Sequence, residues 1–461
     1  MATMLDAKDP ARSLTDEARR LQDQGRLAEA ARLYLEAYRA SPSSFRASRH
    51  LHCARKVSAA SARSALEFAR EAAEAWPEDI WVQREAVWVH YDAYLKGFDA
   101  AGGKAQPEEC RQAIKTARWM LEATREELPV RLAAFGGAKA AKALGAWDEV
   151  LDLLDRMSAE GLSGEPNNAN GKRLPSDRER WYTMRARALF ELRRYDDALA
   201  VASEGAAACG GGEGLPRLQA LSYMALGDLE PARSLLEQID RRCAPQWYVK
   251  ADLARIRMRQ GDVKGALALA CEAALLPGDA KGRIGMFEEM AEMLSTLGSQ
   301  DGAACHLGLA LAIAESEGWE RRRERCARKL DDLFLVHGET LAESALSIDT
   351  AAQPLGAALN RCGGIWRDQL STLRPRRAGR IKAWNAEREF GFITATDGTD
   401  LYFQGRNFRA MGRSPEVGMA VEFEVRSSYD HKKQRDSQVA VDIRPAAPSP
   451  RKPVEPDDLP Y

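Results

Sequence analysis

The sequence predicts a multidomain protein in which an all-α superhelix precedes a small all-β module. From residue 11 to 340, small residues recur at a spacing close to about 34, which is typical of stacked helix pairs. From 377 to 445, short aromatic or alternating runs separated by glycine-containing turns indicate strands. Residues 341–376 between them are assigned to a linker. Residues 446–461, rich in proline and charge, are assigned to a disordered tail.

The overall composition is that of an ordinary folded protein. The chain has 461 residues, of which 45% are hydrophobic. It contains no uncharged apolar run of about 18 residues and no apolar core of a signal peptide near its start, so we expect a cytoplasmic protein without membrane contact. Its eight cysteines are scattered without a C-x-x-C pair, which is typical of reduced cysteines in the cytosol.

The net charge of −1 is unevenly distributed along the chain. Residues 374–444 hold 14 Lys and Arg against 10 Asp and Glu, a net charge of +4. Residues 445–461 hold 2 against 3, a net charge of −1, so residues 1–373 carry −4 by difference. A basic module joined to an acidic body favours nucleic-acid contact confined to the C-terminal part.

A repeated pattern of small residues predicts the helical array. Gly25, Ala30, Tyr34 and Ala37 stand at offsets 0, 5, 9 and 12, a pattern that resembles the second half of a tetratricopeptide repeat. The small residue at the fifth offset recurs at Ala30, Ala65, Ala113, Val150, Ala198, Ala232, Ala266 and Ala303. Corresponding small residues of the first helices are Ala18, Ala138, Ala186, Ala254 and Ala291. Small side chains are required where two helices cross at close distance.

About eight tetratricopeptide-like repeats are thus predicted, with two interruptions and a cap. Two spacings lengthen to 48 residues, at insertions 96–109 and 159–177 that are predicted as loops. Residues 318–337 suit a capping helix, since an array of this kind must cover its last apolar face. Within this helix, Arg321, Arg322 and Arg323 either contact phosphate or belong to a solvated helix face; the solvated face is favoured, since Glu320 and Glu324 lie beside them.

The resemblance to tetratricopeptide proteins implies a concave groove that holds one or more protein partners. In that family the first helix of each repeat usually supplies the contacts. The partner-binding residues we expect on this basis are Arg185, Arg255 and Arg257.

The C-terminal module presents aromatic residues on neighbouring strands. Phe390 and Phe392 are two residues apart and therefore point to the same face of one strand, and a second short strand at 401–403 follows a turn. Exposed rings near Lys382 and Arg388 are typical of a surface on which unpaired bases stack. The alternative is that the rings only fill the core of a barrel.

This stretch resembles the cold-shock domain, a five-stranded OB-type barrel that binds single-stranded RNA or DNA. The first-strand motif is matched at Gly379, Ile381, Lys382, Trp384 and Asn385. The two ribonucleoprotein motifs are matched at 388–393 and 400–405, and later strands at 421–425 and 440–443. The nucleic-acid-binding residues that the resemblance implies are Lys382, Trp384, Arg388, Phe390, Phe392 and Tyr402.

The sequence departs from the cold-shock pattern at three stacking positions. Ala383, Gln404 and Gly405 stand where the family has tryptophan, histidine and an aromatic residue. Two hypotheses therefore remain open. The first is an adaptor whose array holds a protein while its barrel binds a single strand. The second is a purely protein-binding scaffold whose barrel has lost nucleic-acid binding. The basic cluster of Arg374, Arg376 and Arg377 either extends the nucleic-acid contact or lies in a solvated hinge.

The sequence shows no pattern typical of an enzyme. It has no G-x-S-x-G, no H-E-x-x-H and no paired Cys and His arrangement. His50 and Cys53 share a helix face but His52 does not, so a metal site there would lack a third ligand. We therefore expect a non-enzymatic protein without cofactor or metal, and the sequence leaves its oligomeric state open.

Overall fold

The computed structural model describes residues 10–98, 105–169, 172–210, 212–337, 354–373, 376–409, 414–430 and 435–446. The chain divides into two compact units, Met1–Leu226 and Gly227–Tyr461. The predicted tail beyond Ala446, residues 341–353 of the assigned linker and residues 99–104 of the first insertion lie outside the described residues.

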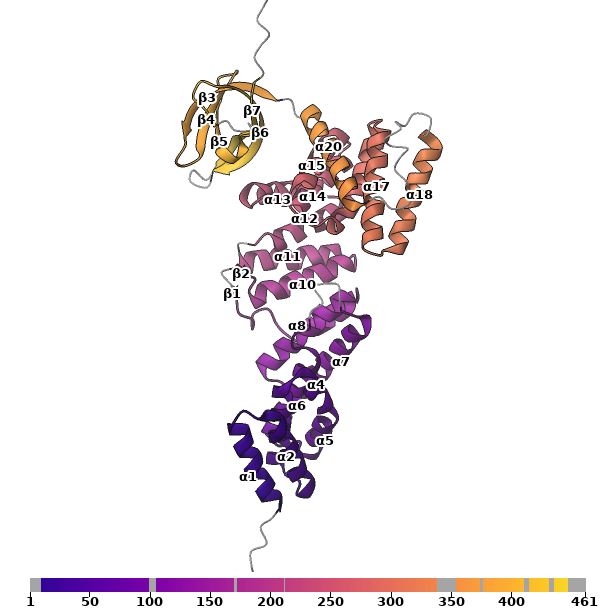
Figure 1. Cartoon of the computed structure of the whole chain (residues 1–461), viewed down its shortest axis with the longest axis vertical. Coiled ribbons are helices and arrows are strands. Elements are labelled where there is room, and N and C mark those ends of the chain that lie inside the picture. The colour runs from indigo at the N-terminus through magenta and orange to yellow at the C-terminus, as the bar shows by residue number, and fades with distance from the viewer. Residues whose placement is uncertain are drawn as a thin grey trace, which may run out of the picture. The chain divides into compact units, whose positions relative to one another are not determined.

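The first unit consists mainly of helices that pack in chain order, each against the next (Figure 1). They are α1 (Pro10–Asp23), α2 (Leu27–Ala40), α3 (Ser44–Val57), α4 (Ala59–Ser64), α5 (Leu66–Ala75), α6 (Ile80–Tyr94), α7 (Pro107–Ala123), α8 (Glu127–Ala143), α9 (Trp147–Leu154), α10 (Asp177–Glu191), α11 (Tyr195–Cys209) and α12 (Gly214–Leu226). The second insertion was predicted as a loop. It instead holds an antiparallel hairpin of β1 (Asn167–Ala169) and β2 (Lys172–Leu174).

The small residues that predicted the repeats are buried between helices. The eight positions at the fifth offset expose at most 4% of their surface, which Ala65 reaches, and the five first-helix alanines expose at most 3%, which Ala291 reaches. Burial at every one of these positions is what close helix crossing requires. The prediction of closely packed helix pairs is therefore confirmed.

The second unit begins with further α-helices and one 3₁₀ helix. They are α13 (Leu229–Arg242), α14 (Trp247–Arg259), α15 (Val263–Leu275), the 3₁₀ helix η1 (Lys281–Arg283), α16 (Ile284–Thr296), α17 (Gln300–Ser316), α18 (Glu320–His337) and α20 (Leu355–Leu373). The predicted capping helix corresponds to α18, whose Cys326 and Leu330 are buried in a shared core with α14–α17. No described helix is both long and apolar enough to cross a membrane.

The assignment of 341–376 to a linker is wrong for α20. This helix packs against α15 and α17, and its Cys362 and Trp366 belong to the same buried core. Trp366 stacks on Phe287 with ring centroids 5.6 Å apart. The mixed composition of the segment concealed one apolar face, which is buried by residues far away in the sequence. The other domain boundaries stay predictions.

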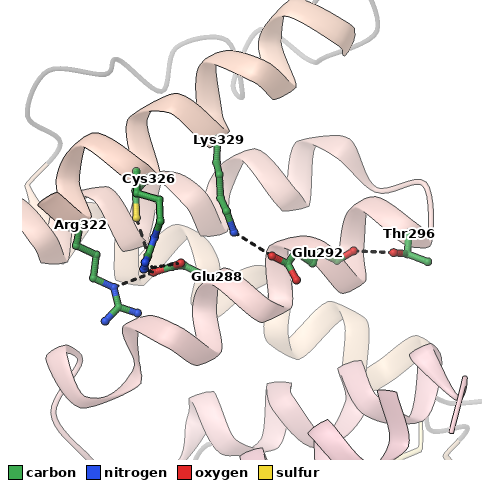
Figure 2. A network of polar contacts seen from close by, with 7 residues as sticks. Glu288, Glu292, Thr296, Arg322, Cys326 and Lys329 are labelled. Atoms are coloured by element: carbon green, nitrogen blue, oxygen red, sulfur yellow. Dashed lines mark hydrogen bonds and ion pairs between the residues drawn. The ribbon is translucent and has the colours of Figure 1, made fainter. Parts of the chain in front are cut away.

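Helix α18 is held to α16 by polar contacts to the buried Glu288 and by an exposed ion pair with Glu292 (Figure 2). The carboxylate of Glu288, which is 7% exposed, accepts hydrogen bonds from Arg322 at 2.8 Å and Arg325 at 3.1 Å. Burial alone would raise the pKa of Glu288, but the two guanidinium groups hold it below its ordinary value. Farther along, Lys329 donates to Glu292 at 2.9 Å in an exposed pair. Arg322 and Glu288 therefore belong to the helix packing.

The C-terminal part is a closed five-stranded barrel in the order β3-β4-β5-β7-β6. Its elements are β3 (Arg377–Asn385), β4 (Phe390–Ala395), β5 (Asp400–Gln404), the 3₁₀ helix η3 (Gly405–Asn407), β6 (Ala420–Asp430) and β7 (Arg435–Pro445). Strands β5 and β7 pair in parallel, whereas the other neighbours in the barrel pair antiparallel. The interior is filled by Ile381, Ile393, Phe403, Phe423 and Ile443, each at most 1% exposed. The predicted five-stranded barrel is confirmed.

Candidate nucleic-acid interface

The outward face of β3, β4 and β5 carries a cluster of three aromatic rings. Phe390, Phe392 and Tyr402 form this ring cluster. Phe392 lies opposite Tyr402 in the β4–β5 register and opposite Ala383 in the β3–β4 register. Phe392 is 39% exposed, and the other two rings are half-buried. Because residues two apart on a strand share a face, Phe390 and Phe392 both point outward, as predicted.

The three rings contact one another and leave the surface apolar. Phe390 and Tyr402 lie 5.9 Å apart with planes inclined by 28°. Phe392 stands edge-on to both, at 6.3 Å from Phe390 and 5.8 Å from Tyr402. Mutual contact of this kind holds the rings in place before any ligand arrives. The cluster offers flat apolar faces to solvent, as base stacking requires.

Gly391 allows the ring cluster to stand outside the core. A Cβ atom at this position would lie 2.4 Å from the carbonyl oxygen of Ala383 and 2.5 Å from the ring of Phe403. The β4 backbone can therefore lie directly over Phe403 only with glycine between the two phenylalanines. The spacing Phe-Gly-Phe thus has a structural cause.

Trp384 does not join the ring cluster, contrary to its predicted place among the stacking residues. The β3–β4 register shifts between Ile381 and Ala383, and this bulge turns Trp384 toward the barrel interior. Its ring stacks on buried Phe403 at 5.5 Å with planes inclined by 11°. A Cβ on Gly405 would lie 2.7 Å from the indole. Glycine at 405 therefore makes room for the inward Trp384.

The predicted cation Lys382 is engaged within the protein. Its ammonium group contacts the carboxylate of Asp400, which also accepts a 2.7 Å hydrogen bond from Thr394. The Lys382 hydrogen bond, with help from Thr394, lowers the pKa of Asp400. The contact lies on the outward face, two register pairs away from Phe392 and Tyr402, with the inward pair Ile393–Leu401 between them. Sequence reasoning missed Asp400, because pairing across strands is not visible in a motif.

Arg388 lies in the turn before β4. Its backbone N–H donates to the side-chain oxygen of Asn385 at 2.9 Å, which fixes the turn. The following Glu389 has a positive φ of 49°, and its carbonyl accepts from Gly405 at 2.7 Å. The Arg388 side chain is exposed. Among the described residues, it is the predicted cation nearest in sequence to the ring cluster.

Arg376 and Arg377 belong to the barrel and its ion pairs. Arg376 donates to Asp442 at 2.7 Å and Arg377 to Asp397 at 3.2 Å. Partial burial alone would raise the pKa of Asp442, but Arg376 and Arg444 lower it. The hinge alternative therefore does not describe these two arginines, whose charges are balanced by the neighbouring carboxylates. Arg374 of the same cluster lies outside the described residues.

The three arginines expected to bind a protein partner are also paired internally. Arg185 belongs to the first unit, where it contacts Asp155 and lies over the Trp181 ring. In the second unit, Arg255 pairs with Glu289 of α16 at 3.0 Å.

Arg257 pairs with Asp262 in the turn after α14, at 3.3 Å. Arg255 and Arg257 lie two residues apart on this helix and contact different neighbours, so they do not form one patch.

The two histidines that were considered as metal ligands also contact different neighbours within the protein. His50 contacts the Ala31 carbonyl and His52 contacts Glu85.

Comparisons with known proteins give one family match, for the barrel, and similar solved structures for the helical part. Residues 377–441 match the family described as the 'Cold-shock' DNA-binding domain. A tetratricopeptide repeat protein from Parabacteroides merdae is 12% identical, with 62% of this chain and 97% of that chain covered and a TM-score of 0.29. A thermophilic TPR protein from Thermus thermophilus is 17% identical, with 41% and 92% covered and a TM-score of 0.31.

A further similar structure is the Cut9–Hcn1 hetero-tetramer of APC/C, at 12% identity, with 76% of each chain covered and a TM-score of 0.39. No curated protein matches the sequence. The protein thus joins a helical array to a five-stranded barrel that matches the 'Cold-shock' DNA-binding domain family.

Proposed function

We propose that the protein is a non-enzymatic adaptor that binds single-stranded RNA or DNA on its barrel and a protein partner on its helical array. The observation that carries the nucleic-acid half is the ring cluster on the outward face of β3, β4 and β5. Three mutually packed rings exposed on a sheet are costly in water unless a flat apolar ligand covers them. Unpaired bases are such ligands, and they stack on aromatic rings without regard to sequence.

The size of the ring cluster sets the expected affinity. Each stacked base contributes about 1–3 kcal/mol, so three rings supply roughly 3–9 kcal/mol. The loss of translational and rotational freedom on association, together with the ordering of side chains, opposes binding by at least about 4 kcal/mol. Since Trp384 is withdrawn into the barrel and Lys382 is paired, we expect modest affinity for single strands of any sequence.

The protein-binding half rests on the helical array. Arrays of stacked helix pairs present extended surfaces that suit peptide or helix recognition. We propose that acidic groups of a protein partner compete with Asp155 for Arg185 in the first unit and, independently, with Glu289 for Arg255 in the second. An acidic group of the partner would likewise replace Asp262 beside Arg257. Because each arginine already has a carboxylate, these contacts add specificity more than affinity.

A second candidate is a scaffold whose barrel docks proteins and has no nucleic-acid ligand. The specific observation in its favour is local charge balance: Asp400 neutralises Lys382, and Glu389 lies next to Arg388. A face without excess positive charge attracts a phosphate backbone weakly. The same apolar rings would then cover an apolar patch of a protein.

The deciding experiment compares two variants of the full chain. Phe390→Ala combined with Phe392→Ala removes two of the three rings. Phe45→Ala removes an equally exposed phenylalanine, 39%, from helix α3. Binding is measured with labelled single-stranded RNA and DNA of about ten nucleotides, within the usual site size of an OB-type barrel.

We expect the double variant to bind at least about thirty-fold more weakly, because two lost stacks correspond to roughly 2–6 kcal/mol. Phe45→Ala should bind as the unchanged chain does. Circular dichroism of each variant checks that the fold is retained. An unchanged chain that binds neither oligonucleotide at low salt would favour the protein-docking scaffold.

A further inference from the structure

Two arginines lie over one exposed phenylalanine ring in the first unit. Arg19, Phe45 and Arg49 form this Phe45 cluster. The guanidinium carbon of Arg19 on α1 lies 5.7 Å from the centre of the Phe45 ring, and that of Arg49 on α3 lies 5.5 Å away. The fully buried Tyr34 contacts the same ring edge-on at 6.4 Å. The helix packing thus fixes the ring, and the ring holds two guanidinium groups close together.

The two arginines of the Phe45 cluster have no acidic partner within the part of the chain that the structure describes. Arg55, farther along α3, is paired instead with Glu85 at 2.6 Å and with Asp92 at 3.0 Å. A guanidinium group can donate two parallel hydrogen bonds to one carboxylate, and such charge-assisted bonds are among the stronger ones. The cluster therefore offers two uncompensated positive charges that suit carboxylates of a ligand.

Large apolar side chains are exposed close to the Phe45 cluster. Ile80 and Trp81, in the first turn of α6, expose 72% and 65% of their surface. Helices α3 and α6 pack against each other. A hydrogen bond from Ser44 at the start of α3 reaches Asp79, which caps α6, and lowers the pKa of Asp79. Because Ser44 directly precedes Phe45, the ring and Trp81 lie on adjacent helix ends.

The charges around this surface favour a peptide over a nucleic-acid strand as its ligand. Glu78 and Asp79 directly precede the exposed apolar pair, so a phosphate backbone that runs from Arg49 to Trp81 would meet like charge there. The cluster's ring is already covered by guanidinium groups, which leaves little of it open to a base. A peptide carries its negative charge on separate side chains, and these can lie against the two arginines alone.

We infer that the Phe45 cluster and Trp81 form a docking surface for an acidic peptide segment of a protein partner, one in which acidic residues flank a large apolar side chain. The acidic side chains lie against the guanidinium groups, and the apolar side chain covers the indole. The inference rests on the protein-binding half of the proposed function and names further residues for it in the first unit. Unlike Arg185, Arg255 and Arg257, the arginines of the cluster have no internal carboxylate to displace.

The test compares the unchanged full chain with three variants. Arg19→Gln combined with Arg49→Gln removes both charges of the cluster. Its matched control, Arg20→Gln combined with Arg32→Gln, removes two exposed arginines of the same unit that have acidic partners one turn away. Trp81→Ala removes the exposed indole. Circular dichroism checks that each variant retains the fold.

The probe is a short fluorescent peptide of glutamate and glycine with leucines at its centre, and its affinity is measured by fluorescence anisotropy at several salt concentrations. A second peptide has glutamine in place of every glutamate, and a third has serine in place of every leucine. A single-stranded DNA oligonucleotide is the fourth probe. The four probes separate the contributions of carboxylates, apolar side chains and phosphates.

We expect the unchanged chain to bind the acidic peptide more tightly than the glutamine peptide, with an affinity that falls as salt is added. Arg19→Gln with Arg49→Gln should bind the acidic peptide about five- to thirty-fold more weakly, because two exposed ion pairs are lost. The matched control should stay within about two-fold of the unchanged chain. Trp81→Ala should weaken binding of the leucine-containing acidic peptide and leave binding of the serine peptide unchanged.

The outcomes separate this inference from the proposed function. Equal binding of the acidic peptide by the two double variants would refute the docking surface and leave the proposed function in place, since the peptide would then be held elsewhere. An absence of acidic-peptide binding at low salt would also refute the inference, and the proposed function fails as a whole only if the chain binds no single-stranded oligonucleotide either. A loss of DNA binding in Arg19→Gln with Arg49→Gln, without peptide binding by the unchanged chain, would assign the surface to nucleic acid instead.

Discussion

The indole N–H of Trp366 on α20 donates to Nε2 of His306 on α17 at 2.8 Å. The opposite ring nitrogen, Nδ1, contacts the Gly302 carbonyl at 2.7 Å, so Nδ1 carries the proton and the imidazole is neutral. His306 is fully buried, and Trp366 exposes 5% of its surface. The pair ties the helix that directly precedes the barrel into the core of the helical array.

Removal of α20 should therefore destabilise the helices of the second unit. A chain ending after residue 337 leaves Phe287 and His306 without Trp366. Loss of one such buried ring costs about 3–5 kcal/mol. We expect early thermal unfolding and rapid proteolysis of α14–α18, whereas a chain ending after residue 373 should unfold as the full chain does, both followed by circular dichroism.

A point variant provides the control for the truncation. Trp366→Ala in the full chain should reproduce most of the loss, while Trp319→Ala, which removes a ring 38% exposed, should have a small effect. Equal stability of the two truncated chains would contradict the assignment of α20 to the helical core.

Acidification should weaken the same contact. Burial lowers the pKa of His306 from 6.5 to about 4. The unfolded chain therefore binds a proton at a pH where the folded protein does not. The neutral His306 therefore contributes roughly 3 kcal/mol to the free energy of unfolding. This contribution is fully present above about pH 6.5 and is lost as the pH falls toward 4.

Denaturant unfolding at pH 7 and pH 5 measures this effect. His306→Gln, which keeps an acceptor for Trp366 but does not titrate, should show a shallower pH dependence than the unchanged chain. Identical pH dependence in the two proteins would mean that other groups account for acid sensitivity.

The two kinds of contact between α16 and α18 should differ in strength. Arg322→Ala leaves buried Glu288 with one fewer partner and should cost about 1–3 kcal/mol. Lys329→Ala breaks the exposed pair with Glu292 and should cost less than about 1 kcal/mol. Chemical denaturation of both variants gives the comparison, and a larger loss for Lys329→Ala would contradict it.

The helical array could be read from the sequence, because its signal is local. Ala30 and Ala303 each stand at a crossing between helices of one repeat, and the required small size repeats along the chain. The contact of Trp366 with His306 joins residues 60 apart. No period marks such a pair, so the mixed composition around α20 suggested a linker.

In the barrel, too, the local pattern was predicted correctly, whereas contacts that depend on strand register were not. Strand alternation placed Phe390 and Phe392 on one face correctly. The resemblance to the cold-shock domain placed Trp384 among the nucleic-acid-binding residues, but the bulge after Ile381 turns its side chain inward, which the motif does not show. The pairing of Lys382 with Asp400 depends on the register of three strands, which a motif match does not supply.

Ultraviolet cross-linking tests the central claim most directly, because it reports which side chains touch the bases. The full chain is irradiated with single-stranded RNA or DNA, and the attached peptides are identified by mass spectrometry. We predict cross-links at Phe390, Phe392 and Tyr402, with none at Trp384 or Trp366. Cross-links confined to the helical array, or an absence of any cross-link to residues 390–402 under conditions where the strand is bound, would contradict binding at the ring cluster.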